Sequence, residues 1–227
     1  DALADSDVSA HLPNFQRIAD GLSVAKIHGE VDSKAKYGLL HHCFLAKMIN
    51  INFQSHNTLL FDKATLFYRS SKSFDVDSLQ NTLHDLARRF QCIDFINIST
   101  SFAHGDFTPW NIVSCSDRLG VFDWEMGLPD APLYFDFFHY VYYGSVLVDQ
   151  LSFDSVLERL SVLQEKYFSD LESKDFIQYH FLYVYIQAFR HLEALESSDD
   201  KPVLQSSWLI EVWTGAFDYF ESKLLEV

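Results

Sequence analysis

An apolar segment near the middle of the chain places the strongest constraint on the fold. Residues 131–148, APLYFDFFHYVYYGSVLV, are apolar on nearly every side of a helical wheel. A helix that is apolar all round has to be buried among other elements. We therefore expect a central buried helix here, in a chain of 227 residues that is long enough to enclose a substantial core.

Helical periodicity recurs on both sides of this segment. Apolar residues at steps of three to five predict a helix over residues 12–27. Residues 57–68 are ambiguous and could be extended or irregular, whereas Asp77 is a candidate N-cap for a helix that follows it. Further helices are expected over residues 36–49, 78–90, 153–168, 174–195 and 205–225, with a polar loop at 196–202.

A short β insert is expected close to the central helix. Gly120 and Gly127 bracket a brief apolar run, which is typical of a strand or hairpin. The predicted fold class is therefore α+β and mostly helical. A single body over residues 1–227 is expected, with a helical leading part at 1–101, a motif-bearing part at 102–127 and a helical part at 128–227.

Composition excludes several classes of function. A net charge of −15, from 17 Lys and Arg against 32 Asp and Glu, argues against nucleic-acid binding because no basic face can be assembled. No apolar run is long enough to predict a membrane span. Three widely spaced cysteines, Cys43, Cys92 and Cys115, indicate neither a disulfide framework nor a zinc site, so a cytoplasmic location is expected.

One short block concentrates side chains that carry chemistry. In FAHGDFTPWNIV, His104, Asp106 and Asn111 follow the spacing H-x-D-x-x-x-x-N, which is found in kinase catalytic loops. Twelve residues later Asp123 ends an apolar run in VFDWE. A carboxylate at that point could join Asn111 in holding magnesium, which prefers oxygen ligands.

HGDFTPWNIV followed by GVFDWE resembles the aminoglycoside phosphotransferase and choline kinase group of small-molecule kinases. The resemblance implies a protein-kinase-like fold and Asp106 as the catalytic base, with His104 bracing the loop. It also implies that Asn111 and Asp123 hold Mg²⁺ on the phosphates of ATP. The partners would be this nucleotide and a small hydroxyl-bearing acceptor of the aminoglycoside, amino alcohol or sugar type.

Other positions receive supporting roles from the same resemblance. Glu125 could support the metal or accept a hydrogen bond from the substrate, and Trp110 and Trp124 either wall the nucleotide cleft or pack in the core. Asp136, near the start of the central helix, is the candidate for anchoring the catalytic loop.

The residues before His104 depart from the family pattern. A kinase needs an N-terminal lobe with a glycine-containing loop and a lysine that hold the ATP phosphates. Residues 1–103 contain no glycine-rich loop, and Lys26, in VAKI, reads as a surface lysine on the helix predicted there. The expectation is a kinase-like C-terminal lobe without its N-terminal ATP lobe in this chain.

Three alternatives remain open at this point. The block could be an ordinary turn, since Asp, Asn, Thr and Pro all favour turns. A metallophosphoesterase would need further His and Asp ligands on later strands, where His139, His180 and His191 instead fall in helical patterns. A non-catalytic kinase-like binding module would agree with the missing phosphate loop.

Overall fold

The central apolar segment forms a buried helix. The structure, a computed structural model, describes residues 14–18, 22–26, 30–31, 36–51, 54–55, 59–70, 78–90, 98–115, 118–197 and 204–224. Helix α4 (Phe135–Tyr143) has every residue from 135 to 142 buried, as predicted, and continues into a π-helical turn at Gly144–Val148. The helix begins later than expected because Leu128–Pro132 forms strand β8.

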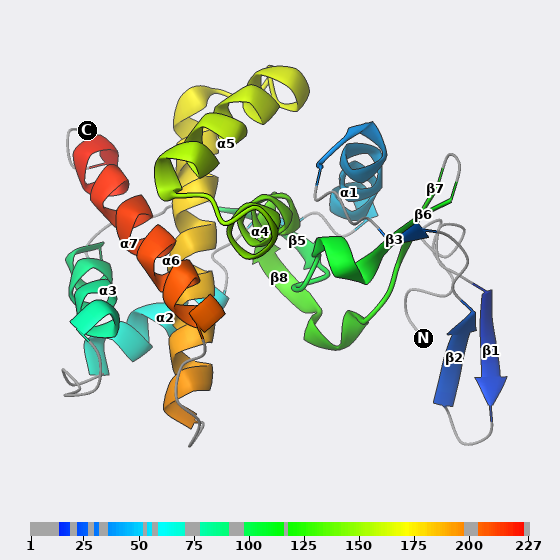
Figure 1. Ribbon diagram of the computed structural model, residues 1–227, viewed down its shortest axis with the longest axis horizontal. Helices are drawn as coiled ribbons and strands as arrows, with labels where there is room; N and C mark the ends of the chain where they lie inside the picture. The colour runs from blue at the N-terminus through cyan, green and yellow to red at the C-terminus, as the bar shows by residue number, and fades with distance from the viewer. Residues whose placement is uncertain are drawn as a thin grey trace.

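Long helices cover this centre. Figure 1 shows α2, α3, α6 and α7 gathered to one side of α4, with α5 above it and α1 on the other side. Phe181, Tyr185 and Ala188 of α6 are fully buried, so this helix forms a second apolar layer of the core. The bounds are α1 (Leu39–Ile51), α2 (Leu59–Ser70), α3 (Ser78–Arg89), α5 (Phe153–Tyr167), α6 (Ser173–Ser197) and α7 (Leu204–Leu224).

Three small antiparallel sheets are found among the described residues. Their strands are β1 (Asn14–Ile18) with β2 (Leu22–Lys26), β3 (Glu30–Val31) with β6 (Ile112–Cys115) and β7 (Arg118–Val121), and β4 (Gln54–Ser55) with β5 (Ser99–Ala103) and β8. The HGDFTPWN block joins β5 to β6, and therefore lies between two of these sheets. A mostly helical α+β fold is confirmed.

The prediction of a helix over residues 12–27 is wrong. The chain forms an antiparallel hairpin there, in which Asn14 pairs with Lys26 and Ile18 pairs with Leu22. The sequence between the strands contains Asp20-Gly21, a dipeptide that favours tight hairpin turns and outweighs the loose apolar spacing. Lys26 therefore ends a strand and is not a helical residue.

Residues 57–68, whose sequence pattern was ambiguous and could have been extended or irregular, are mostly helical. Helix α2 spans Leu59–Ser70 and buries Ala64 and Tyr68 on one face, so tertiary packing fixes a segment whose local pattern was ambiguous. The expected helices at 36–49 and 78–90 are confirmed as α1 and α3. The Asp77 cap and most of the 196–202 loop lie outside the described residues.

None of the helices in the described part of the chain combines the length and apolar character needed to cross a membrane.

Candidate active site

The HGDFTPWN block forms a loop between β5 and β6 that its own sequence shapes. Pro109 begins a short 3₁₀ turn over Pro109–Asn111, where its fixed φ and missing N–H fit the first helical position. Gly105 has a φ of 79°, a left-handed conformation that favours glycine. A Cβ at this position would overlap the carbonyl group of Met126, so the glycine also allows the loop to approach the turn at Trp124–Met126.

Asp136 ties this loop to the central helix. Its carboxylate accepts hydrogen bonds from the backbone N–H of His104 at 2.6 Å and of Gly105 at 2.9 Å. Burial raises the pKa of Asp136, while the electrostatic contribution of His104 and these two backbone hydrogen bonds act in the opposite direction. The contact between Asp136 and the loop, which the resemblance implied, is therefore present.

His104 braces the loop from within the core. Its side chain is fully buried, its Nε2–H donates to the carbonyl oxygen of Phe122 at 2.9 Å, and its Nδ1 accepts from the backbone N–H of Asp106 at 3.2 Å. The two bonds fix one tautomer of the ring. The indole ring of Trp124 lies 4.5 Å from the His104 ring, so this tryptophan packs against the loop. The buried imidazole, hydrogen-bonded through both ring nitrogens, therefore holds the loop to the strand end at Phe122.

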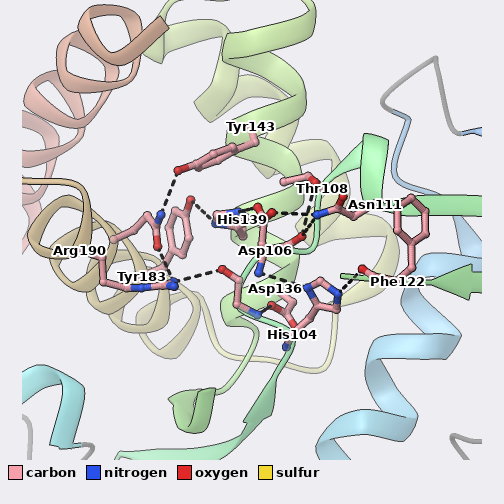
Figure 2. Close-up of polar contacts among 12 residues, drawn as sticks. His104, Asp106, Thr108, Asn111, Phe122, Asp136, His139, Tyr143, Tyr183 and Arg190 are labelled. Atoms are coloured by element: carbon pink, nitrogen blue, oxygen red, sulfur yellow. Dashed lines mark hydrogen bonds and ion pairs between the residues drawn. The ribbon is translucent and has the colours of Figure 1, made fainter. Parts of the chain in front are cut away.

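Asp106 presents a partly accessible carboxylate held from two sides. Asn111 Nδ2 donates to Oδ2 at 2.8 Å, and His139 Nε2 donates to Oδ1 at 3.2 Å, while the side chain remains 29% exposed. Figure 2 shows Asp106 between these two partners. Burial acts to raise the pKa of Asp106, but the hydrogen bond and electrostatic contribution of His139, with those of His104 and Asn111, lower the pKa below its ordinary value. The carboxylate is therefore ionised at neutral pH and oriented.

His139 is a site residue that sequence reasoning missed. It is fully buried on α4, and its Nδ1 accepts a hydrogen bond from the Tyr183 hydroxyl at 3.5 Å, which leaves Nε2–H to donate to Asp106. Burial lowers the pKa of His139 despite the opposing effect of Asp106, so the ring is neutral. A signal was available in the sequence, because Asp136 and His139 lie three residues apart and share one face of the helix.

Arg190 of α6 also contacts the loop, and no local sequence pattern indicated this contact. Its Nη1 donates to the carbonyl oxygen of Gly105 and to Gln187 Oε1, both at 3.1 Å. Gln187 in turn donates to the Tyr143 hydroxyl at 3.0 Å, and the Tyr143 ring stacks on His139 at 4.0 Å. The network in Figure 2 thus joins the loop to α4 and α6. Arg190 is engaged by the loop backbone and holds its shape.

Asn111 and Asp123 offer the oxygen atoms that a magnesium site needs. Both partners of Asn111 Nδ2, the carbonyl and a carboxylate oxygen of Asp106, are acceptors, so that atom is the nitrogen and Oδ1 remains available. Phe122 N–H donates to the Asn111 carbonyl at 3.1 Å, which continues the β6–β7 pairing and brings Asp123 to the same end of the hairpin. The exposed Asp123 carboxylate has no hydrogen-bond or ion-pair partner among the described residues. One carboxylate and one carboxamide fit Mg²⁺, which usually keeps several waters.

The backbone at Asp123 adds a second observation. Its φ of 66° and ψ of 59° lie in the left-handed region, which Asp adopts more readily than most residues but still at an energetic cost. Such conformations concentrate at functional sites. The conformation turns the chain directly after β7, and Trp124 Nε1 donates back to the Val121 carbonyl at 3.0 Å.

The remaining predicted site residues lie near the loop with different exposure. Trp110 is 41% exposed, with its ring 6.3 Å from that of Tyr143, and Glu125 is exposed beside Asp123. Of the later histidines, His180 is buried and hydrogen-bonded to Tyr142 at 2.6 Å, and His191 packs against Trp213. In the described part of the chain no three His, Cys, Asp or Glu side chains come together as a metal-binding group.

Comparison with known proteins agrees with this geometry. The model of the phosphotransferase enzyme family (APH) matches residues 44–158, just over half of the 227 residues. The chain belongs to the phosphotransferase enzyme family. No curated protein and no solved structure matches. The matched range contains the loop, the β6–β7 hairpin and all of α4, so the family assignment rests on the part of the chain that builds the site.

Membership in the phosphotransferase enzyme family confirms the recognised resemblance and supports a kinase-type enzyme. Enzymes of this family generally use ATP and Mg²⁺ and act on small molecules. The mostly helical α+β architecture agrees with a kinase-like fold.

Proposed function

We propose that this protein transfers the γ-phosphoryl group of ATP to a hydroxyl group of a small molecule of the aminoglycoside, amino alcohol or sugar type. The observation that carries the proposal is the Asp106 carboxylate, which is 29% exposed, bonded on both oxygens and kept ionised by its surroundings. A base for this reaction has to be ionised, reachable by the substrate and fixed in direction. Asp106 meets all three requirements.

The chemistry assigned to the chain's residues is limited to positioning and proton transfer. Asp106 accepts a hydrogen bond from the acceptor hydroxyl and takes its proton as the oxygen bonds to the γ-phosphorus. The bond from that phosphorus to the bridging oxygen breaks, and its electron pair leaves with ADP. Asn111 and Asp123 would hold Mg²⁺, which neutralises negative charge on the phosphates when bound. Glu125 and the exposed ring of Trp110 would border the nucleotide.

The domain organisation is part of the same proposal. The loop, the β6–β7 hairpin and α4 would form the centre of a kinase-like C-terminal lobe, with the nucleotide also held by an N-terminal lobe.

The experiment that tests the function is acceptor-dependent release of ADP by the full-length protein with a panel of hydroxyl compounds, with the phosphate ester identified by ³¹P NMR. ADP release that needs an acceptor supports phosphotransfer. Nucleotide binding without transfer to any acceptor would favour a kinase-like binding module.

Replacing Asp123 by alanine should weaken binding of ATP in the presence of magnesium. Mutating a residue that only hydrogen-bonds to a metal ligand lowers metal affinity about 10- to 100-fold. Removing a direct ligand is therefore expected to weaken metal-dependent binding at least about tenfold. Calorimetric titration of ATP with and without magnesium measures this. The exposed Asp154 of α5 is a matched control, and Asp154→Ala should bind as the wild type does. Unchanged magnesium-dependent affinity in Asp123→Ala would contradict the assignment.

Replacing His139 by phenylalanine should raise the pKa of Asp106. Burial raises that pKa, whereas the hydrogen bond and electrostatic contribution of His139 lower it, so removing His139 leaves the burial effect less opposed. The acid limb of the pH profile of kcat/KM should therefore move to higher pH, and the ¹³C signal of the Asp106 carboxyl should titrate at higher pH. His139→Gln, which keeps an N–H donor, should shift both less. An Asp106 pKa that stays the same in His139→Phe would show that His139 has no tuning role.

A further inference from the structure

A cavity of about 340 Å³ lies apart from the catalytic loop. It is partly open and is lined by α1, the end of β5, the start of α4 and the end of α5. Figure 1 shows α1 on the opposite side of α4 from the α2, α3, α6 and α7 helices. Its volume falls within the range of about 300–1,000 Å³ that is typical of small-molecule pockets. Neither Asp106, Asn111 nor Asp123 is among the described residues that line it. The three side chains assigned to the proposed phosphotransfer therefore lie outside this cavity.

One polar atom in the cavity wall has no partner. Tyr37 lines the cavity, and its hydroxyl oxygen is buried without a hydrogen bond to any described residue. An unsatisfied buried donor destabilises a fold, so a partner for it is favoured. The rings of Phe137 and Tyr167 pack edge-on against the Tyr37 ring at 5.0 and 5.6 Å, so the ring cannot move its hydroxyl oxygen toward another acceptor. Burial also raises the pKa of Tyr37, which keeps the group a donor.

The charges around the cavity restrict what can enter. No lysine or arginine is among its described lining residues, and burial lowers the pKa of His42, so that this ring is neutral at neutral pH. The two acidic residues are Asp136, whose carboxylate oxygens already bind the catalytic loop, and Asp170, which is exposed. An anion would therefore meet only negative charge. A cation would find a single exposed carboxylate beside walls that are mainly apolar, such as Leu45 and Phe168.

We infer that this cavity binds an uncharged, largely apolar small molecule whose acceptor oxygen takes the hydrogen bond of the Tyr37 hydroxyl. The apolar body of the ligand would be covered by side chains of α1, α4 and α5, and the oxygen would satisfy the buried Tyr37 donor in the cavity wall. Apolar walls with a few placed polar groups are the usual composition of such sites.

The site also touches the anchor of the catalytic loop. Asp136 lines the cavity, and the same residue accepts hydrogen bonds from the His104 and Gly105 amides. A ligand that packs against Asp136 would exclude water from this side of the carboxylate and reduce opening of the two bonds. Given the proposed phosphotransfer, occupancy of the cavity would therefore regulate the loop that carries Asp106. Binding itself does not depend on that function.

The test uses acetophenone, an apolar ring with a carbonyl acceptor, as the probe for the wild-type protein. Ethylbenzene, which has no acceptor oxygen, and benzoate, which is an anion, are the comparison compounds. We expect saturable binding of acetophenone by NMR titration, weaker binding of ethylbenzene and no binding of benzoate. Absence of saturable acetophenone binding, or benzoate binding of equal affinity, would overturn the inference.

Two variants locate the site. Tyr37→Phe removes only the hydroxyl oxygen, and the loss of one hydrogen bond should weaken acetophenone about 2- to 10-fold while leaving ethylbenzene unchanged. Ala46→Trp, on the α1 wall, should fill the cavity and abolish binding of both, whereas Val162→Trp on the exposed face of α5 is the matched control and should bind as the wild type does. Unchanged acetophenone affinity in Tyr37→Phe would overturn the inference even if Ala46→Trp fails to fold.

Coupling to the loop has a separate readout. Acetophenone should slow hydrogen exchange of the His104 and Gly105 amides in the wild type, and should do so less in Tyr37→Phe at the same concentration. Binding without slower exchange would overturn the regulatory part of the inference. Neither readout uses ATP, so failure of the cavity site and failure of the proposed phosphotransfer are distinguishable.

Discussion

Replacing Asp106 by alanine is expected to lower turnover about 10²–10⁴-fold, the usual contribution of a positioned general base. The carboxylate is the one group in the loop that is both accessible and held ionised, with Asn111 and His139 directing its oxygens. Alanine would leave the acceptor hydroxyl without a proton acceptor. The measurement is kcat for ADP release at saturating acceptor and nucleotide.

Two controls separate chemistry from folding in this experiment. Asp106→Asn keeps the shape of the side chain but cannot take a proton, so it should lose nearly as much activity as Asp106→Ala. Asp62→Ala, at an exposed position in the first turn of α2, should keep wild-type turnover. Asp62→Ala should also unfold at the wild-type temperature, whereas the Asp106 variants lose acceptors of His139 and Asn111, so thermal unfolding is measured beside turnover to confirm that each variant is folded in the assay. Wild-type turnover in Asp106→Ala would rule out Asp106 as the base.

Replacing Asp136 by alanine is expected to destabilise the fold and disable the site together. The carboxylate is 5% exposed, and its loss would leave the buried N–H groups of His104 and Gly105 without an acceptor. Each unsatisfied group costs about 1–3 kcal/mol, although removing a buried carboxyl offsets part of this. We expect a net loss of about 2–5 kcal/mol, a large share of the 5–15 kcal/mol that typically stabilises a domain.

Urea unfolding of the Asp136 variants measures this loss. Asp136→Asn retains one acceptor oxygen but places an amide nitrogen near a backbone N–H, so its stability should lie between those of the wild type and Asp136→Ala. Turnover should fall in both variants because the loop loses its attachment to α4. A free energy of unfolding that is unchanged in Asp136→Ala would show that the loop is held mainly by other contacts, such as that of Arg190 with Gly105.

Local patterns predicted much of the helical fold correctly. The all-round apolar character of residues 131–148 predicted the burial of α4, and three- to four-residue periodicity predicted α1, α3, α5, α6 and α7. Local patterns failed where the apolar spacing was loose. At residues 12–27 the sequence carries an Asp-Gly turn signal and the chain forms a hairpin. At residues 57–68 packing stabilises a helix.

The candidate site likewise combines residues that the sequence predicted with contacts that it did not predict. The sequence by itself determined His104, Asp106, Asn111 and Asp123 as candidates, because a catalytic loop and its neighbouring hairpin place these residues at short and fixed spacings. Only the tertiary structure decided what surrounds them. Arg190 reaches Gly105 across 85 positions of the chain, and Tyr183 reaches His139 across 44. Linear spacing carries no information about such contacts, because they exist only once α4 and α6 pack against the loop.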